Sequence, residues 1–243
     1  MNVYKSSTAD IHSLSALIRE HGLGHTLPQR AQPRHAAVPT GIEEFDIRLG
    51  GGLLRGAICE VIGPCSSGRT GLLLAVLARS TQAGEIAAYV DATDCLDQRS
   101  AEQAGVDLGR LLWIRCNTEG GLCGPQGAWG HAPSDEAWQA ANLVAAAGGF
   151  GVVAIDLGGL SERQLGRWQG RAWMRLKHAV EGSSTTLVVL AERHVAGSAA
   201  GMVLRLRREH TAWEGLLGGI DLQVEVVKDK ARRAAGKAAG RAA

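Results

Sequence analysis

The chain contains one stretch whose residue types and spacing could hold a phosphate group: Gly63-Pro64-Cys65-Ser66-Ser67-Gly68-Arg69-Thr70. Glycines let backbone N–H groups curl around an anion, and the N-terminus of a helix adds positive potential. The spacing is that of the P-loop, G-x-x-x-x-G-K-[ST], with arginine in the lysine position. An apolar segment precedes the loop and a helix-like run follows it, so we expect this stretch and Gly71 to bind a nucleotide.

A carboxylate in the Walker B position supports the same interpretation. Asp156 ends the apolar segment Gly151–Ile155, and a carboxylate at a strand tip can face the metal of a bound nucleotide. Thr70 carries the hydroxyl that coordinates magnesium at P-loops. ATP and Mg²⁺ are therefore the expected ligands. The guanidinium of Arg69 is longer and broader than an ammonium group, so we expect weak binding, and a vestigial pocket stays an alternative.

Composition limits the class of protein. The 243 residues carry a net charge of +2 and are 45% hydrophobic, which suits one α/β domain with short extensions. No apolar run is long enough to span a bilayer, and we expect a soluble cytoplasmic protein. Zinc and haem are not expected, because the cysteines form no C-x-x-C pair. We interpret them all as reduced thiols: Cys59, Cys65, Cys95, Cys116 and Cys123.

Three regions follow from the residue pattern. Residues 1–39 read as a helix and an extended linker, residues 40–228 as the core, and residues 229–243 as a basic tail with little to bury. The helix is expected over Thr8–Gly22, where four apolar residues share one face. That face could dock on its own core or on a neighbouring subunit through Ile11, Leu14, Leu17 and Ile18.

Within the core, apolar strand-like segments alternate with helix-like ones, which predicts parallel β-α-β units. The expected strands are Ala57–Ile62, Ile86–Val90, Leu111–Arg115, Gly151–Ile155, Thr186–Ala191, Met202–Arg208 and Leu222–Lys228. The expected helices are Gly71–Thr81, Gln98–Ala104, Asp135–Ala147 and Arg163–Glu181. The last two strands are joined by a glycine-containing turn and predict an antiparallel edge.

An ordered series of motifs resembles the bacterial RecA core over roughly residues 40–230. The segments that carry the resemblance are Gly41–Ile47, Leu49–Leu53, the P-loop, Val90-Asp91-Ala92 and Val226-Val227-Lys228-Asp229-Lys230. The resemblance implies a RecA-like P-loop fold, in which helices flank a mostly parallel twisted sheet and antiparallel strands form its C-terminal edge. It also implies that Asp97 can reach the edge of an adenine base.

Other positions depart from the RecA pattern. Thr93 stands where RecA has the glutamate that orients the attacking water, and a threonine cannot act as a carboxylate base. Ser100 replaces the aromatic residue that stacks on adenine. Glu192 lies near the position of the glutamine that links the nucleotide to DNA. Both DNA loops are short and the large C-terminal domain has no counterpart, so we expect weak ATP hydrolysis or none.

This set of departures is similar to the ImuA family, short RecA-like paralogues encoded beside DNA polymerase subunits. The resemblance implies a bacterial, nucleoid-associated adaptor that acts in the SOS response, in DNA repair and in damage-induced translesion synthesis. It implies an ImuB-like Y-family polymerase subunit and an error-prone DnaE-type polymerase as partners, with RecA and single-stranded DNA as further candidates.

Clustered basic residues predict a surface for DNA or an acidic partner, with an ordinary solvated face as the alternative. Four arginines recur every four residues on the helix expected at Arg163–Glu181, namely Arg163, Arg167, Arg171 and Arg175. Arg205 and Arg207 share one strand face, while Lys228 and Lys230 precede further basic residues of the tail. Trp168 and Trp173 are interpreted as packing residues.

Two other functions stay open at this point. An active single-stranded-DNA-dependent ATPase or recombinase of minimal size would need Asp94 or Glu192 to supply the missing carboxylate. Asp94 is a doubtful substitute, because neighbouring residues that leave a strand point in different directions. Alternatively, the chain could be a DNA-binding protein whose nucleotide pocket is vestigial.

Overall fold

The computed structural model describes residues 37–116, 133–166, 168, 170–213 and 217–230 of the chain. The helix expected over Thr8–Gly22, its four apolar residues and the basic tail beyond residue 230 lie outside the described residues. Ala37 and Val38, which we assigned to the linker, pair with Leu53 and Leu54 in a small antiparallel sheet.

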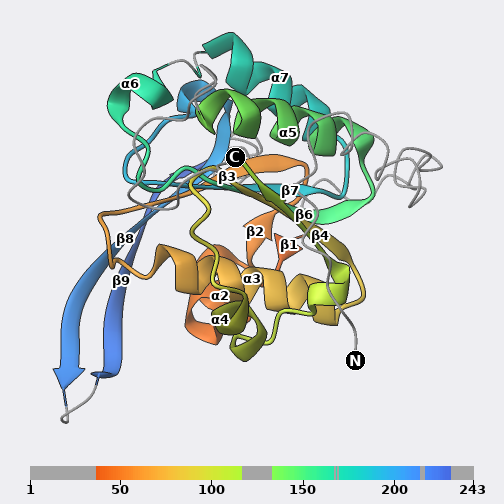
Figure 1. The fold of residues 1–243 in the computed structure, drawn as a ribbon. Helices are drawn as coiled ribbons and strands as arrows, with labels where there is room; N and C mark the ends of the chain where they lie inside the picture. Colours follow the sequence, from red (N-terminus) through yellow and green to blue (C-terminus); the bar gives the residue numbers. More distant parts are fainter. Residues whose placement is uncertain (1–36, 117–132, 167, 169, 214–216, 231–243) are drawn as a thin grey trace, which may run out of the picture.

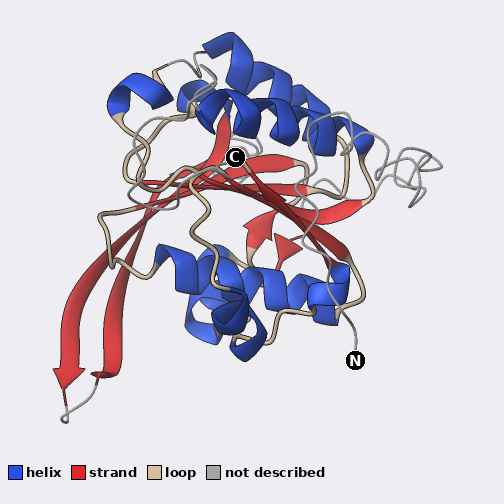
Figure 2. Ribbon diagram, in the orientation of Figure 1, coloured by secondary structure: helices blue, strands red, loops and turns tan. Residues whose placement is uncertain are grey.

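A seven-stranded sheet in the order β5-β4-β6-β7-β3-β8-β9 forms the centre of the molecule (Figure 2). All neighbouring pairs are parallel except β8 and β9, which pair antiparallel at one edge. The expected fold class is therefore confirmed. The strands are β1 (Ala37–Val38), β2 (Leu53–Leu54), β3 (Ala57–Ile62), β4 (Ile86–Asp91), β5 (Leu111–Arg115), β6 (Phe150–Asp156), β7 (Thr186–Ala191), β8 (Ala200–Trp213) and β9 (Leu217–Asp229).

Helices cover both faces of the sheet, as Figure 1 shows. On one side lie α2 (Glu43–Leu49), α3 (Arg69–Gln82) and α4 (Gln98–Gln103). On the other side lie α5 (Pro133–Ala147), α6 (Glu162–Leu165) and α7 (Gly170–Val180). Two 3-10 turns, η1 (Leu108–Arg110) and η3 (Gly197–Ala199), complete the described elements. None of the described helices is long and apolar enough to cross a membrane.

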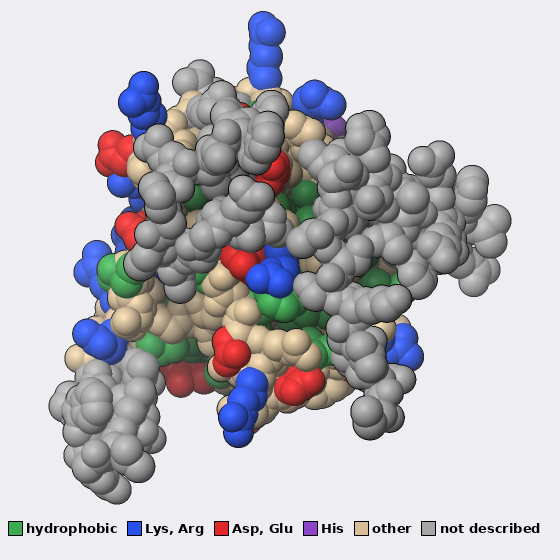
Figure 3. All heavy atoms as spheres, viewed as in Figure 1, with side chains coloured by type: hydrophobic (Ala, Val, Ile, Leu, Met, Phe, Trp, Pro, Cys, Tyr) green, Lys and Arg blue, Asp and Glu red, His purple; other side chains and the backbone are tan. Residues whose placement is uncertain are grey.

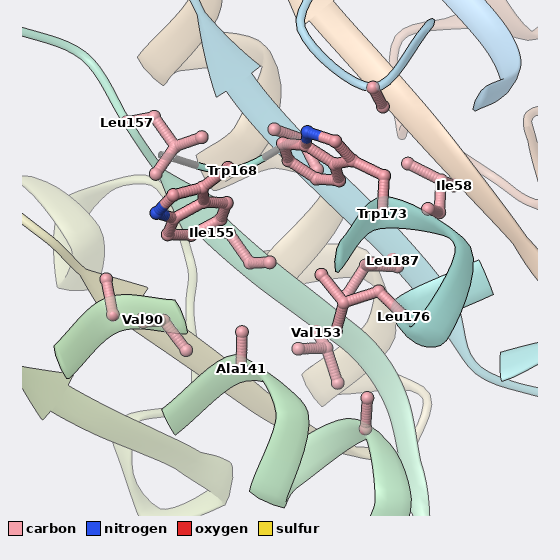
Figure 4. Close-up of a cluster of buried hydrophobic side chains, with 14 of the residues drawn as sticks. Ile58, Val90, Ala141, Val153, Ile155, Leu157, Trp168, Trp173, Leu176 and Leu187 are labelled. Carbon is pink, nitrogen blue, oxygen red and sulfur yellow. The ribbon is translucent and has the colours of Figure 1, made fainter. Parts of the chain in front are cut away.

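The sheet separates two apolar cores. Every residue of β6 and β7 is buried, as expected for central parallel strands that are covered on both faces. The core beneath α5 and α7 contains Trp168 and Trp173, which point toward one another beside the aliphatic side chains of the sheet (Figure 4). With Trp138 they form three ring contacts at centroid distances of 5.0–6.3 Å. The interpretation of both tryptophans as packing residues is confirmed.

The helix expected over Arg163–Glu181 is wrong, because two helices replace it. Ser161 closes a capping box at the start of α6, and Gly166 ends that helix. Trp168 then turns into the core, where it is 4% exposed, and α7 begins at Gly170. Glycine has a poor helix propensity, and burying Trp168 requires a bend that a continuous helix would not allow.

The C-terminal strands are longer than expected. β8 and β9 form a hairpin whose far end extends beyond the body of the sheet (Figure 1). Its inner part packs on β3, since Cys59 pairs with Met202 and Ile62 pairs with Arg205. The hairpin therefore reaches the P-loop, which begins where β3 ends.

Candidate nucleotide-binding site

The P-loop joins the end of β3 to the start of α3, as the spacing predicted. Gly68 is the N-cap residue of α3 and has the left-handed backbone conformation (φ 85°) that favours glycine. A Cβ atom on Gly68 would lie 2.5 Å from Leu222 Cδ1, and one on Gly63 would lie 2.4 Å from the carbonyl oxygen of Leu206. Gly63 is thus required by close approach of the β8 backbone, and Gly68 by its left-handed conformation, with the side chain of Leu222 beside it.

Two polar side-chain atoms of the P-loop are buried without a hydrogen-bond partner. They are Ser67 Oγ and Arg69 Nη1, and in the described part of the chain only Trp173 Nε1 shares this property. Buried polar atoms are normally satisfied in folded proteins, so an unsatisfied one needs an explanation. A phosphate would supply acceptor oxygens to both groups, and the amides of the first turn of α3 are not capped by a side chain.

The Walker B carboxylate lies at the tip of β6, as expected, in a closed environment. Asp156 is 7% exposed. Its Oδ2 accepts a 2.8 Å hydrogen bond from the hydroxyl of Tyr89, and its Oδ1 accepts one of 2.8 Å from the amide of Gly158. Burial raises the pKa of Asp156, although these two hydrogen bonds and the charge of Arg69 act in the opposite direction.

Arg69 extends from the P-loop toward this carboxylate. The position that a Cβ atom of Gly158 would take is 3.8 Å from Arg69 Nη2 and 3.0 Å from Asp156 Oδ1. The guanidinium and the carboxylate therefore both lie close to the Cα side of Gly158 that would carry a side chain. Arginine stays protonated at all relevant pH values, so a permanent positive charge lies near Asp156.

The site fits a phosphate better than a magnesium ion held directly by Asp156. Both carboxylate oxygens of Asp156 already accept a hydrogen bond, and Arg69 provides a cation beside it. A magnesium ion bound directly to Asp156 would share these oxygens with Tyr89 and Gly158 and would be repelled by the positive charge of Arg69. Thr70, the other expected ligand, is exposed on the first turn of α3. Among the described residues, no group of three or more His, Cys, Asp or Glu side chains could hold a metal.

Thr93 lies beside the Walker B segment but carries no carboxylate. Its hydroxyl donates to the carbonyl oxygen of Gly158 at 3.3 Å and lies 3.0 Å from Cys95 Sγ. Asp94, the next residue, forms two hydrogen bonds of 2.6 Å with the guanidinium of Arg115 on β5. This ion pair directs Asp94 toward the β5 edge of the sheet and away from β3.

Glu192 and Asp97, two further residues that we expected in the site, lie in different surroundings from each other. Glu192 is exposed and accepts a 3.6 Å hydrogen bond from the thiol of Cys65, so it lies next to the P-loop. Asp97 caps α4 by accepting from the amide of Ser100 at 3.0 Å and from its hydroxyl at 2.5 Å. These hydrogen bonds lower the pKa of the Asp97 carboxyl. The structure therefore places Glu192 at the loop and gives Asp97 a local capping role.

Sequence reasoning missed a buried acid on the P-loop strand. Glu60 is fully buried on β3, where its Oε1 accepts from the amides of Val195 at 2.8 Å and Ala196 at 2.9 Å. Its Oε2 contacts the ring of His194. The signal was present as one acidic residue inside an otherwise apolar strand. Through these contacts Glu60 connects the segment after β7 to β3, the strand that leads into the P-loop.

The arginines that we expected on one helix are divided between two helices in the described part of the chain. Arg163 is exposed on α6, whereas Arg171 and Arg175 are exposed on α7, and Arg167 lies outside the described residues. Basic and acidic side chains are interspersed on the face drawn in Figure 3. Arg193, after β7, forms an ion pair with Glu162 on α6.

The basic residues of the hairpin lie partly in ion pairs and loop contacts. Arg205 and Arg207 alternate with buried Leu204 and Leu206, as expected for one strand face, and Arg205 contacts Glu225 at 3.0 Å. The amino groups of two lysines donate to carbonyl oxygens of the η3 turn. Lys228 contacts Gly197 at 2.8 Å, and Lys230 contacts Ser198 at 2.5 Å.

The fold and the loop define a P-loop protein, and comparison with known proteins gives the family. Residues 12–121 match the RecA N-terminal domain family. Protein RecA of Acidothermus cellulolyticus is 30% identical over 254 residues, which cover 90% of this chain and 69% of that protein. This chain therefore belongs to the RecA family, whose members act in DNA repair and recombination.

Other relatives match over shorter regions. Protein RecA of Marinobacter nauticus is 44% identical over 103 residues, covering 41% of this chain and 30% of the relative. Protein RecA of Methylococcus capsulatus is 40% identical over 120 residues, covering 49% of this chain and 30% of the relative. These two alignments have higher identity than the one with the Acidothermus protein, but each leaves more than half of this chain unmatched.

Proposed function

We propose that this chain is a RecA-family accessory protein of bacterial DNA repair that binds ATP but hydrolyses it slowly or not at all. The observation that carries the proposal is the pair of buried polar atoms without partners in the P-loop, Ser67 Oγ and Arg69 Nη1. A phosphate bound at the uncapped N-terminus of α3 would offer acceptor oxygens to these two donors. The family membership supports ATP as the nucleotide.

The surroundings of Thr93 support slow or absent hydrolysis. A hydroxyl without a neighbouring base cannot accept the proton of an attacking water, and Asp94 is held by Arg115 through two short hydrogen bonds. Losing a group that orients the nucleophile typically costs several orders of magnitude in rate. The nucleotide then serves as a structural or regulatory ligand.

The role in damage-induced translesion synthesis rests on the resemblance to the ImuA family. In this role the chain is an adaptor for an ImuB-like Y-family subunit and a DnaE-type polymerase, with RecA and single-stranded DNA as further binding partners. Exposed arginines on α6, α7 and the hairpin are the candidate contact residues. Pull-down of each purified candidate with the full chain tests the role, and failure to bind any of them contradicts it.

Calorimetric titration of the full chain with ATP tests the nucleotide proposal. We expect saturable binding with one site per chain, and we expect Ser67→Ala to weaken it severalfold because one phosphate donor is lost. An absence of heat, together with an unchanged melting temperature in ATP, would contradict the proposal and favour a DNA-binding protein with a vestigial pocket.

One observation favours a second candidate function, an active ATPase. Glu192 lies next to the P-loop, where its carboxylate accepts from the thiol of Cys65. If Glu192 acts as the base, the chain hydrolyses ATP in the presence of single-stranded DNA and Glu192→Gln abolishes the activity. If Glu192→Gln hydrolyses ATP at the same rate as the unaltered chain, Glu192 is not the catalytic base.

A further inference from the structure

The buried end of the Arg69 side chain lies inside the candidate site. Arg69 Nη1 is inaccessible to solvent and has no hydrogen-bond partner, although a guanidinium normally satisfies its donors when buried. Arg69 Nη2 lies 3.8 Å from the position that a Cβ atom of Gly158 would take, and Asp156 Oδ1 lies 3.0 Å from the same position. The side chain is therefore directed into the space between the P-loop and the end of β6.

Asp156 is arranged as a partner for that cation. Its two oxygens accept one hydrogen bond each, from Tyr89 and from Gly158, which fixes the orientation of the carboxylate. The positive charge of Arg69 is among the groups that act on this carboxyl. At an ordinary P-loop, a magnesium ion supplies positive charge between the Walker B carboxylate and the phosphates.

We propose that the site binds its nucleoside triphosphate without a divalent cation, because the guanidinium of Arg69 supplies the positive charge beside Asp156. This inference rests on the proposed nucleotide-binding function and specifies the ionic form of the ligand, the metal-free triphosphate. Arg69 thereby combines two tasks that the lysine and the magnesium ion divide between them at other P-loops.

The chemistry of the guanidinium fits this double task. It is planar, permanently charged and carries five N–H donors, so it can donate to phosphate oxygens on one edge while its charge faces a carboxylate. Lysine is a compact point charge that would reach the phosphates and leave the space beside Asp156 for a hydrated ion. Lysine at this position should therefore restore the need for magnesium.

Titration of the full chain with ATP, in excess Mg²⁺ and again in excess EDTA, tests this inference. For the unaltered chain we expect dissociation constants in the two conditions that agree within about threefold. For Arg69→Lys we expect binding in EDTA to be at least about tenfold weaker than in Mg²⁺, a difference of about 1.4 kcal/mol in binding free energy, because one positive charge is then missing from the site. Arg79→Lys, an exposed arginine on the same helix, is the matched control and should behave like the unaltered chain.

The outcomes separate the two proposals. Binding of the unaltered chain that weakens tenfold or more in EDTA overturns the metal-free inference and leaves the nucleotide proposal in place. Absence of ATP binding in both conditions overturns both. Water-proton relaxation with Mn²⁺ gives a second readout. We expect no enhancement when the protein is added to Mn²⁺ and ATP, and strong enhancement would show metal at the site.

Discussion

At the residue scale, the candidate site depends on a few charged groups that are held in unusual places. Asp156 is a buried acid that accepts two hydrogen bonds, and Arg69 is a half-buried cation whose buried Nη1 has no hydrogen-bond partner. Burying a charge without a direct ion pair costs free energy in the folded protein. These charged groups are therefore expected to lower the stability of the folded protein, as is common where residues are selected for binding and not for stability.

Replacing Asp156 by asparagine should stabilise the protein. The amide keeps an acceptor for Gly158 and can donate to the Tyr89 hydroxyl, while the buried charge is removed. We expect the melting temperature at pH 8 to rise by about 2–4 °C, which is roughly 1 kcal/mol for a domain of this size. Scanning calorimetry of both proteins measures the shift, and a lower melting temperature in the variant would argue against a strained carboxylate.

The same substitution should change how stability depends on pH. Because burial raises the folded-state pKa of Asp156 above its ordinary value of 3.8, the folded protein holds this proton more tightly than the unfolded chain does. Its contribution to stability is thus greatest at low pH and is lost as pH rises through the folded-state pKa. The advantage of Asp156→Asn should grow from pH 4 to pH 8, and a constant advantage would be evidence against this assignment.

At the element scale, Glu60 connects the P-loop strand to the segment that follows β7. It accepts from two backbone amides and contacts His194, all from a fully buried position in the sheet. Buried backbone amides that lose their acceptor pay the full cost of desolvation. Glu60 is therefore the residue through which this segment is fixed to β3.

Glu60→Ala should lower the free energy of unfolding by about 3 kcal/mol, because two backbone amides and His194 lose a fully buried partner. Glu60→Gln keeps one acceptor oxygen and should cost less than half as much. Urea unfolding of the three proteins compares them. Equal losses in the two variants would mean that the carboxylate charge, rather than the amide contacts, fixes the segment.

The elements of this fold differ in how well their residues predict them. β3, β5 and β7 match the expected bounds, because each is a mostly apolar run of five or six residues set off by glycines or polar residues. The expected helix over Arg163–Glu181 failed because the helical spacing continues across Gly166 and Gly170, while the burial of Trp168 decides the bend. The seven-residue α2 was not predicted, since a helix this short gives little periodic signal.

The candidate site was predictable in part. The P-loop and Asp156 follow from local spacing, whereas their surroundings depend on pairing between distant segments. Tyr89 reaches Asp156 because β4 and β6 are neighbours in the sheet, and Asp94 is held because Arg115 lies on the next strand. Such contacts join residues that are 67 and 21 positions apart, and residue patterns along the chain do not show them.

At the scale of the whole molecule, the β8–β9 hairpin contacts the P-loop. Leu222 of β9 packs on Gly68, and the carbonyl oxygen of Leu206 on β8 approaches Gly63. The loop is therefore shaped by the last strands of the fold as well as by the strand and helix that it joins. A change in the hairpin should alter nucleotide binding without any direct contact to the ligand.

Gly68→Ala tests this coupling. The added methyl meets Leu222 and the residue must keep a left-handed conformation, so we expect a loss of about 2 kcal/mol in stability and at least tenfold weaker ATP binding. Adding Leu222→Ala removes the collision and should recover part of the ATP affinity. The double variant binding no better than Gly68→Ala would show that backbone strain alone accounts for the effect.

The fate of bound ATP tests the central claim most directly. The full chain is incubated with radiolabelled ATP and single-stranded DNA, recovered by rapid ultrafiltration, and its nucleotide is identified by chromatography. We predict about one ATP per chain at saturation, recovered intact, because the loop holds the triphosphate and Thr93 cannot activate water. Recovery of ADP with released phosphate, or of no nucleotide at all, would contradict the account.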